Sequence, residues 1–474
     1  MIRKRIGLVI GPILFCVVFF LHPFEDLNAE ANAVLASTLW IATWWLSEAL
    51  PISATALLPI ALLPLSGGAP IAQTTAAYGD KMLFLFVGGF IIAIAMQRWN
   101  LHRRIAIEII SAVGTNAQLI VLGFMLATGL LSMWISNTAT TLMMVTIATA
   151  LIAEMKELTG KAGNIFFKSL LLGIAFSASI GGVATLVGTP TNPIFVSIAS
   201  KLYAQEFSFA SWMAFALPFS LVMLAICWII LTRIVFPLHK INISIGQELI
   251  QKEKEALGQM KQEEKVVAIV FVITAILWIT RSFVLNQFIP GINDTVIAIA
   301  AALMMFILPS KSLNGKPLLT WEEAEKLPWG VIILFGGGLS LAAAFQSSQL
   351  AEWLGLQLIG ISELPLFIII LIVALSVNFL TEVTSNVATA SIMLPVLASL
   401  AEAIGVHPFL LMIPATMAAS CAFMLPIATG PNAIVFSSGE LKMNDMVRAG
   451  VWLNIISSIA ITLLVYYIIP SFLK

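Results

Sequence analysis

Two short polar runs interrupt otherwise apolar sequence, and their compositions are almost the same. They are Ser136-Asn137-Thr138-Ala139-Thr140 and Ser385-Asn386-Val387-Ala388-Thr389. The hydrocarbon core of a bilayer tolerates interrupted backbone only where it faces a protected cavity. Because hydroxyl and amide groups at such an interruption can bind ions, the matched pair predicts one site assembled from two copies.

Each run suits both an anion and a cation. A helix that begins at the run points its unpaired N–H groups and its positive dipole end at the gap, which favours an anion. The preceding helix leaves free carbonyl oxygens that, with Ser and Thr hydroxyls, can coordinate a hard cation such as sodium. Ser132 and Thr381 add hydroxyls one helical turn before Ser136 and Ser385. We therefore predict that each break holds both ions.

A second polar break follows in each half of the chain. Gly188-Thr189-Pro190 and Ala428-Thr429-Gly430 each combine a small residue, a hydroxyl and a helix-stopping Pro or Gly, as an interrupted spanning helix requires. Pairing each Ser-Asn run with one such helix near the bilayer midplane would place the site between two repeats. Polar groups without formal positive charge would then bind the anion.

The chain is a duplicated unit. Phe86 and Ser136 match Phe335 and Ser385 at a constant separation of 249 positions (335 − 86 and 385 − 136), and the second breaks match at 240 (428 − 188). A constant separation across similar but non-identical sequence indicates an internal repeat. Two polar breaks in each repeat are harder to explain as structural glue between helices, which is the ordinary role of a single Ser, Thr or Asn in a membrane helix.

Composition assigns the chain to the membrane. The 474 residues are 60% hydrophobic and 10% charged, with a mean hydropathy of +1.02, which no water-soluble core could bury. The formal charge of zero gives no reason to expect a nucleic-acid partner. Three scattered cysteines and four isolated histidines form neither a disulfide framework nor a metal or nucleophile set, so we do not expect an enzyme.

Apolar runs predict an all-α polytopic protein with about eleven spans and two re-entrant helical hairpins. The hairpins are the blocks 118–153 and 365–402, which carry the Ser-Asn runs at their middles. A charged helical linker is expected at 239–265, on the cytoplasmic side and solvated. The spans are expected near 6–22, 32–49, 52–66, 82–98, 168–200, 206–232, 266–287, 292–309, 329–346, 408–438 and 446–470.

Charge distribution orients these spans. With a cytoplasmic N-terminus and non-crossing hairpins, 20 of the 24 Lys and Arg lie inside and only Lys81, Lys201, Arg281 and Lys474 lie outside, as the positive-inside rule requires. The C-terminus is then outside and the two repeats have inverted topology. The first segment also imitates a signal peptide, but removing it would leave the other loops without this favourable orientation.

Three further features have open or ordinary interpretations. Glu382 lies within the second hairpin, where a carboxylate is expensive, and either a buried structural acceptor or an ion or proton role fits it. Glu48 and Asp80 lie near span ends, where solvated placement is expected. The runs Gly88-Gly89 and Gly336-Gly337-Gly338 lack the Lys-Ser/Thr of a phosphate loop and suit close helix packing.

In these paired motifs and their order, the chain resembles the divalent anion/sodium symporter family, which includes sodium-dependent di- and tricarboxylate carriers. The resemblance implies a homodimer in the cell membrane, with a scaffold that holds the dimer and a transport part that moves as an elevator. The corresponding segments are scaffold 1–117 and 266–364, and transport part 118–238 (hairpin 118–153, broken helix 168–200) and 365–474 (hairpin 365–402, broken helix 408–438).

The resemblance also implies residue roles. Val387 departs from the doubled Ser-Asn-Thr pattern and removes one hydroxyl, which bears on substrate choice. One sodium ion would bind Ser132, Ser136, Asn137 and Gly188, and the other Thr381, Thr384, Asn386 and Ala428. Substrate carboxylates would meet Ser136, Asn137, Thr138, Thr189, Ser385, Asn386 and Thr429, with Val387 beside them.

The resulting hypothesis is sodium-coupled uptake of a small dicarboxylate such as succinate, malate or fumarate. A dicarboxylate exchanger, or a sodium-coupled citrate or sulfate carrier, is the alternative within the same class. An anion channel is the alternative from a different class, but it would need an open polar pathway, whereas the sequence offers one compact site between inverted halves.

Overall fold

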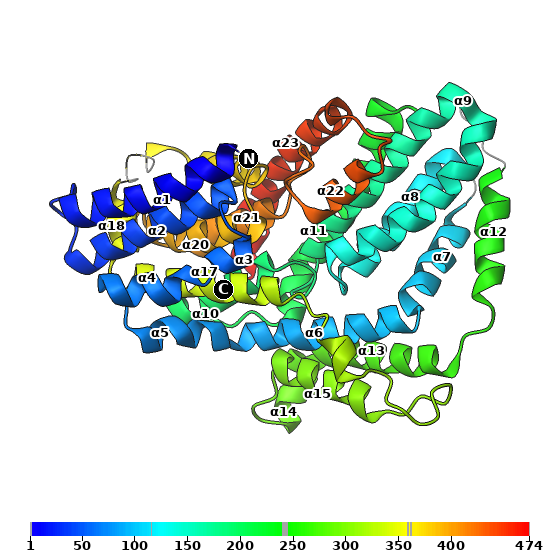
Figure 1. Ribbon diagram of the computed structural model, residues 1–474, viewed down its shortest axis with the longest axis horizontal. Coiled ribbons are helices and arrows are strands. Elements are labelled where there is room, and N and C mark those ends of the chain that lie inside the picture. The colour runs from blue at the N-terminus through cyan, green and yellow to red at the C-terminus, as the bar shows by residue number, and fades with distance from the viewer. Residues whose placement is uncertain (1, 115, 239–244, 358–359, 361–362, 474) are drawn as a thin grey trace.

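The chain folds into packed helices, and helices far apart in the sequence lie together (Figure 1). The computed structural model describes residues 2–114, 116–238, 245–357, 360 and 363–473, and within the helices it leaves the side chains of residues 2, 154–162 and 245–250 undescribed. Apart from an isolated β-bridge between Pro309 and Pro317, the regular elements of these residues are helical. An all-helical membrane fold was predicted, and this class is confirmed.

The first half of the chain contains eleven α-helices in the described residues. The predicted span 52–66 is divided, because Pro51 and Pro59 flank a break near residue 57, whereas α6 covers the predicted span 82–98 without interruption and a 3-10 turn at Ala77–Gly79 precedes it. The helices are α1 (Ile2–Leu21), α2 (Ala29–Ser47), α3 (Ile52–Thr55), α4 (Leu58–Ser66), α5 (Ile71–Ala76), α6 (Lys81–Arg98), α7 (Leu101–Val113), α8 (Ala117–Ser132), α9 (Asn137–Val183), α10 (Thr191–Tyr203) and α11 (Phe209–Ile229).

The second half follows a linker helix, α12 (Ile245–Leu257), which packs on α7 and lies at the edge of the molecule in Figure 1. The first residues of the predicted linker, 239–244, lie outside the described residues. The remaining helices are α13 (Gln262–Thr280), α14 (Asn286–Phe288), α15 (Asp294–Ile307), α16 (Trp321–Ala324), α17 (Trp329–Ser347), α18 (Leu350–Gln357), α19 (Leu366–Thr381), α20 (Asn386–Ala403), α21 (Phe409–Ala419), α22 (Gly430–Ser437) and α23 (Met443–Tyr467).

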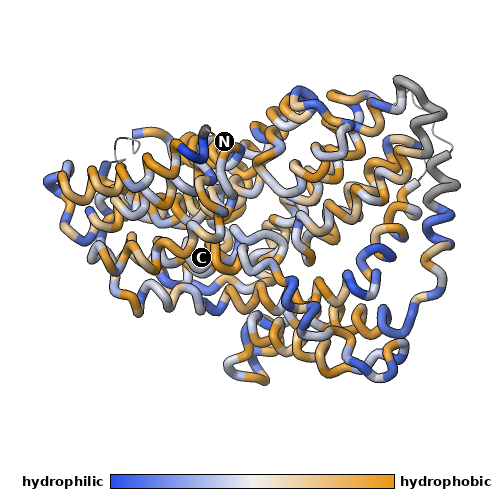
Figure 2. Tube along the Cα trace, in the orientation of Figure 1, coloured by the Kyte–Doolittle hydropathy of each residue, from blue (hydrophilic) through white to orange (hydrophobic). Residues whose placement is uncertain are grey.

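Apolar residues line most helices along their length, and hydrophilic residues gather at helix ends and connections (Figure 2). Eight helices of the described residues are long and apolar enough to cross a membrane. Seven of the eight match predicted spans, and the eighth, Asn386–Ala403, is an arm of the predicted second hairpin. The predicted spans 32–49, 52–66, 292–309 and 408–438 have no counterpart among the eight, so the count of eleven stays a prediction. The eight are Arg3–Leu21, Ile71–Arg98, Gly163–Val183, Phe209–Val235, Gln262–Phe288, Trp329–Ser347, Asn386–Ala403 and Met443–Ser471.

Helix α9 differs from the prediction. We expected the first hairpin to end at 153 and a new span to begin at 168, but the helix is continuous over its 47 residues. At 1.5 Å per residue it is about 70 Å long, more than twice the hydrocarbon thickness, so it joins the hairpin arm to the first part of the broken helix. The connecting stretch 154–167 contains two Glu and two Lys, which favour helix, and no Pro, so the helix continues through Gly160 and Gly163.

The glycine runs pack helices closely, as expected. An added Cβ at Gly88 would lie 2.7 Å from the backbone of Ala298 in α15, and one at Gly337 would lie 2.5 Å from the carbonyl oxygen of Ala56. A Cβ at Gly338 would collide with the side chain of Ser391 in α20. Helices α6 and α17 therefore sit directly against their neighbours, and α17 meets the arm of the second hairpin.

Candidate functional site

Both Ser-Asn runs form the tips of helical hairpins. Helix α8 ends at Ser132 and α9 begins at Asn137, while α19 ends at Thr381 and α20 begins at Asn386. Ser136 is the N-cap of α9, and its hydroxyl accepts from the backbone N–H of Ala139 at 3.3 Å. Each tip therefore places one helix C-terminus and one helix N-terminus side by side, as the sequence predicted.

The tip hydroxyls make equivalent bonds in the two halves. Ser132 donates to the carbonyl oxygen of Ala178 at 2.8 Å, and Thr381 donates to that of Ala419 at 3.0 Å. Thr381 also bonds Asn386 Oδ1 at 2.7 Å. These bonds fasten each hairpin tip to the helix that precedes the second break.

Asn137 ties its own tip to the first break. Its amide satisfies its surroundings when the nitrogen donates to the carbonyl oxygens of Ala178 (3.1 Å) and Gly188 (3.2 Å). Ser132 Oγ lies against the same amide. Three residues predicted for the first sodium site, Ser132, Asn137 and Gly188, are thus brought into direct contact.

The second breaks are unwound segments at 184–190 and 420–429. One asparagine spans each of them. Asn192 Nδ2 donates to the carbonyl oxygens of Val183 (3.1 Å) and Thr185 (2.7 Å). Asn432 Nδ2 donates to those of Ala422 (3.2 Å) and Leu425 (3.0 Å). Amide groups in these positions replace the helical bonds that the breaks have lost.

Neither asparagine was predicted as a site residue, although a signal was present. Asn192 and Asn432 stand at the same separation of 240 positions (432 − 192) as the rest of the second breaks. Both are fully buried and serve the backbone of the break. They are positioning residues for the segments that carry Thr189 and Thr429.

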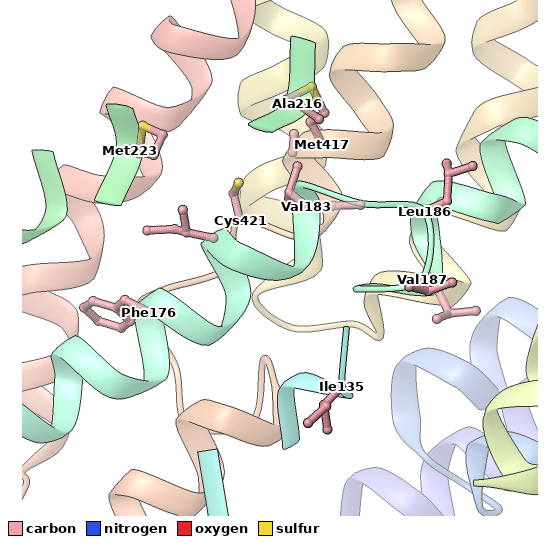
Figure 3. Close-up of a cluster of buried hydrophobic side chains, with 14 of the residues drawn as sticks. Ile135, Phe176, Val183, Leu186, Val187, Ala216, Met223, Met417 and Cys421 are labelled. Carbon is pink, nitrogen blue, oxygen red and sulfur yellow. The ribbon is translucent and has the colours of Figure 1, made fainter. Parts of the chain in front are cut away.

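The two unwound segments meet inside the protein. Ser420 Oγ lies 2.7 Å from Thr191 Oγ1 and 3.4 Å from Thr189 Oγ1. Figure 3 shows buried apolar side chains around this contact, where Val183 at the end of α9 lies near Met417 of α21 and Cys421 of the second break. Buried apolar contact and hydroxyl bonds together hold the two breaks in one unit.

The Glu382 carboxylate accepts hydrogen bonds from the backbone of the second break. It is 3% exposed and accepts the backbone N–H groups of Phe423 (2.7 Å), Met424 (2.8 Å) and Leu425 (2.9 Å), together with the Asn454 amide (2.7 Å). Four donors occupy both carboxylate oxygens. Of the two interpretations that the sequence left open, this geometry fits the structural acceptor.

A cavity of about 680 Å³ lies between the two hairpin tips and the two breaks. All eight residues predicted to face the substrate line it: Ser136, Asn137, Thr138, Thr189, Ser385, Asn386, Val387 and Thr429. Gly188, Thr384 and Ala428 of the predicted sodium sites line it as well, whereas Ser132 and Thr381 are buried behind the tips. The cavity is therefore built from all four polar breaks.

Four helix N-termini converge on this cavity. The N-cap residues of α9, α10, α20 and α22 are Ser136, Pro190, Ser385 and Thr429, and all four line it. Each N-terminus presents free N–H groups and a partial positive charge. Since two of the four belong to each repeat, the cavity suits an anion with two separated negative groups.

The same walls offer oxygen atoms to a cation. Hydroxyl, amide and unwound carbonyl oxygens surround each tip, and such a donor set fits sodium better than a transition metal, which prefers His and Cys. Among the residues that the structure describes, Arg3 and Glu48 are the charged side chains in the lining. Arg3 donates to the carbonyl oxygens of Leu46 and, at 3.2 Å, of Val383 beside the second tip.

Comparison with known proteins gives strong matches over the whole chain. The family described as the sodium:sulfate symporter transmembrane region matches residues 3–471. The sodium-dependent dicarboxylate transporter SdcS of Staphylococcus saprophyticus is 46% identical over 482 residues, which covers 100% of this chain and 92% of that protein. The protein of the same name from Staphylococcus aureus strain bovine RF122 is 47% identical over 476 residues, with 98% and 91% covered.

Two solved structures share the fold at low identity. The YdaH transporter of Alcanivorax borkumensis has a TM-score of 0.62 at 14% identity and covers 94% of this chain and 99% of its own. MtrF of Neisseria gonorrhoeae has a TM-score of 0.56 at 12% identity, with 98% and 94% covered. The helical architecture is therefore that of known membrane transporters.

Proposed function

The chain belongs to the divalent anion/sodium symporter family, and we propose that it couples sodium entry to uptake of a small dicarboxylate. The observation that carries the proposal is the convergence of four helix N-termini, two from each repeat, on one cavity. A dicarboxylate has two negative ends, and each can face one Ser-Asn tip. The relatives with full-length similarity bear the name sodium-dependent dicarboxylate transporter.

The C4 acids succinate, malate and fumarate are the substrates we propose. Ser136, Asn137, Thr138 and Thr189 would bind one carboxylate, and Ser385, Asn386 and Thr429 the other, with Val387 as the apolar contact. This division follows the repeats, since the first four residues come from one repeat and the others from its copy, and all of them line the cavity.

Sodium would bind at each tip, behind the substrate. Ser132, Ser136, Asn137 and Gly188 would supply oxygen atoms to one ion, and Thr381, Thr384, Asn386 and Ala428 to the other. Because Asn137 and Asn386 would take part in both ion and substrate sites, each sodium ion would order the groups that meet a carboxylate. That sharing would couple the two binding events.

The elevator partition, the homodimer and the orientation in the cell membrane belong to the same proposal. Scaffold segments 1–117 and 266–364 would form the dimer, while 118–238 and 365–474 would carry the cavity across the membrane. Arg3, Glu48 and Pro328 line the cavity and belong to segments that we predict to be cytoplasmic. In that orientation the cavity of this structure opens inward.

Uptake into proteoliposomes tests the proposal. Labelled succinate should accumulate against its gradient when sodium is imposed outside, and potassium or choline should not replace sodium. Transport that ignores sodium but requires internal dicarboxylate would replace symport by exchange. Uptake of citrate or sulfate in preference to succinate would change the substrate class, and flux proportional to voltage without saturation would indicate a channel.

A further inference from the structure

A cluster of ion pairs lies at the membrane face opposite the predicted cytoplasmic one. Lys201 bonds Asp80 at 2.9 Å, and Lys81 bonds Glu206 at 2.5 Å. Arg281 pairs with Asp294 at 2.6 Å. Lys81, Lys201 and Arg281 are three of the four basic residues that the charge distribution assigns to the outside. These three basic residues, which are far apart in the sequence, therefore lie in one cluster, and the charge distribution predicts that its face is the outer one.

Asp80 is not solvated, which corrects the expectation from the sequence. Its side chain is 8% exposed and accepts from Ser197 Oγ at 2.8 Å as well as from Lys201. Its other oxygen caps α6 by accepting from the backbone N–H of Met82 at 2.9 Å. The partners Ser197 and Lys201 lie on α10, over a hundred positions away, so local sequence could not reveal them.

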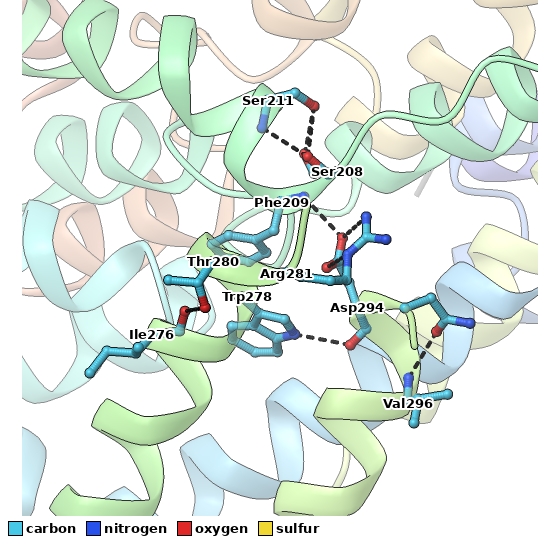
Figure 4. Close-up of polar contacts among 10 residues, drawn as sticks. Ser208, Phe209, Ser211, Ile276, Trp278, Thr280, Arg281, Asp294 and Val296 are labelled. Atoms are coloured by element: carbon cyan, nitrogen blue, oxygen red, sulfur yellow. Dashed lines mark hydrogen bonds and ion pairs between the residues drawn. The ribbon is translucent and has the colours of Figure 1, made fainter. Parts of the chain in front are cut away.

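These contacts join the two parts of the proposed elevator. Asp80, Lys81 and Asp294 belong to the scaffold, whereas Lys201 and Glu206 belong to the transport part. The backbone N–H of Phe209, at the start of α11, donates to Asp294 Oδ2 at 2.9 Å, which Figure 4 shows beside Arg281. The stretch from α10 to α11 is therefore fixed to the scaffold at three points.

An aromatic stack continues this attachment toward the first hairpin tip. Phe209 stacks on Trp278 of the scaffold with ring centroids 4.7 Å apart. Trp134 stacks on Phe209 at 5.7 Å and meets Phe271 of the scaffold edge to face at 5.1 Å. Trp134 lies in the tip itself, between Ser132 and Ser136. Stacking of this kind contributes beyond the apolar area that it buries.

We propose that this cluster is a latch: the pairs Asp80–Lys201 and Lys81–Glu206, with Asp294 on the Phe209 backbone, hold the transport part closed to the outside. The inference rests on the proposed function, because a latch matters only in a protein that alternates its access. Movement of α10 and α11 past α6 and α15 would break all three contacts. The strength of the latch then sets how often the cavity opens outward.

Charge reversal tests the latch without disturbing the core. Lys81 and Glu206 have side chains that are 45% and 62% exposed, so both tolerate substitution. Lys81→Glu and Glu206→Lys each replace attraction by repulsion, and the double variant restores attraction in the opposite sense. For an exposed pair we expect each single variant to raise the outward-open population about three- to tenfold.

A reporter cysteine in the cavity measures that population. Leu142 lines the cavity, and Leu142→Cys in a Cys16→Ser background places a thiol there, since Cys227 and Cys421 are buried. A membrane-impermeant maleimide should label it slowly from the face that carries the cluster. Each single reversal should speed that labelling three- to tenfold, and the double variant should return it to the original rate. Glu253→Lys is a matched control, because its partner Arg103 lies at the other face.

Unchanged labelling in the single variants would overturn the latch, and so would fast labelling that persists in the double variant. Sodium-driven succinate uptake is measured in the same vesicles without any reversal. If uptake is absent but labelling follows the charge pattern, the proposed function fails while the latch stands. If uptake is normal and labelling is indifferent to charge, the latch alone fails.

Discussion

Replacing Glu382 by glutamine would remove one acceptor from a carboxylate that four hydrogen-bond donors surround. Oε1 accepts from Phe423, Met424 and Asn454, while Oε2 accepts only from Leu425. The glutamine oxygen would keep the first position, which leaves the amide nitrogen facing the N–H of Leu425. The glutamine amide and the backbone N–H of Leu425, both hydrogen-bond donors, would then face each other at a buried position.

The expected penalty follows from these contacts. A hydrogen bond to a charged group contributes about 1.5–3 kcal/mol, and the remaining three bonds weaken when the charge is lost, so the total is about 2–4 kcal/mol. The second break, which carries Ala428 and Thr429, would lose order. If at least about 2 kcal/mol falls on the sodium-bound state, the half-saturating sodium concentration rises roughly thirtyfold.

Sodium dependence of succinate uptake measures this effect for Glu382→Gln. Size-exclusion profile and thermal unfolding would show whether the protein remains folded. Glu402→Gln is the matched control: Glu402 lies at the far end of α20, the other arm of the same hairpin, and accepts from the Tyr203 hydroxyl at 2.6 Å. The control should leave sodium dependence unchanged. Wild-type sodium dependence and stability in Glu382→Gln would refute the claim that this carboxylate orders the break.

Three other outcomes follow from the cavity and its orientation. Asn137→Ala or Asn386→Ala should each abolish sodium-coupled uptake in a folded protein, and near-normal uptake in either would contradict the shared ion and substrate site. Val387→Thr restores the missing hydroxyl, and one added hydrogen bond of about 1 kcal/mol should change the ratio of citrate to succinate inhibition about fivefold; an unchanged ratio would remove this position from specificity. Cysteines at the exposed positions Lys316 and Gln287 should be labelled from opposite membrane faces, and labelling from one face would overturn the topology.

The sequence predicts the tips and breaks well because their chemistry is local. A Ser-Asn run or a Gly-Thr-Pro break can be recognised from a few neighbouring residues. Because the chain is duplicated, each motif occurs twice. All eight predicted substrate-facing residues line one cavity as a result. The roles assigned to them stay predictions until binding is measured.

Long-range partners could not be predicted in the same way. Glu382 acts on backbone N–H groups more than forty positions away, and those groups are free only because the second break is unwound. From the sequence, Asp80 resembles a solvated residue at the end of a span. Its partner Lys201 lies on α10 and is close only in the folded protein. The continuity of α9 is not evident from the sequence, because a fall in hydropathy along a continuous helix resembles an interruption of that helix.

The claim that the cavity between the two tips holds the substrate is tested most directly by a structure determined with succinate in sodium, compared with one in choline. We expect succinate between the Ser136–Thr138 tip and the Ser385–Val387 tip in sodium, and none in choline. Succinate bound elsewhere in the protein, or bound equally well without sodium, would contradict it.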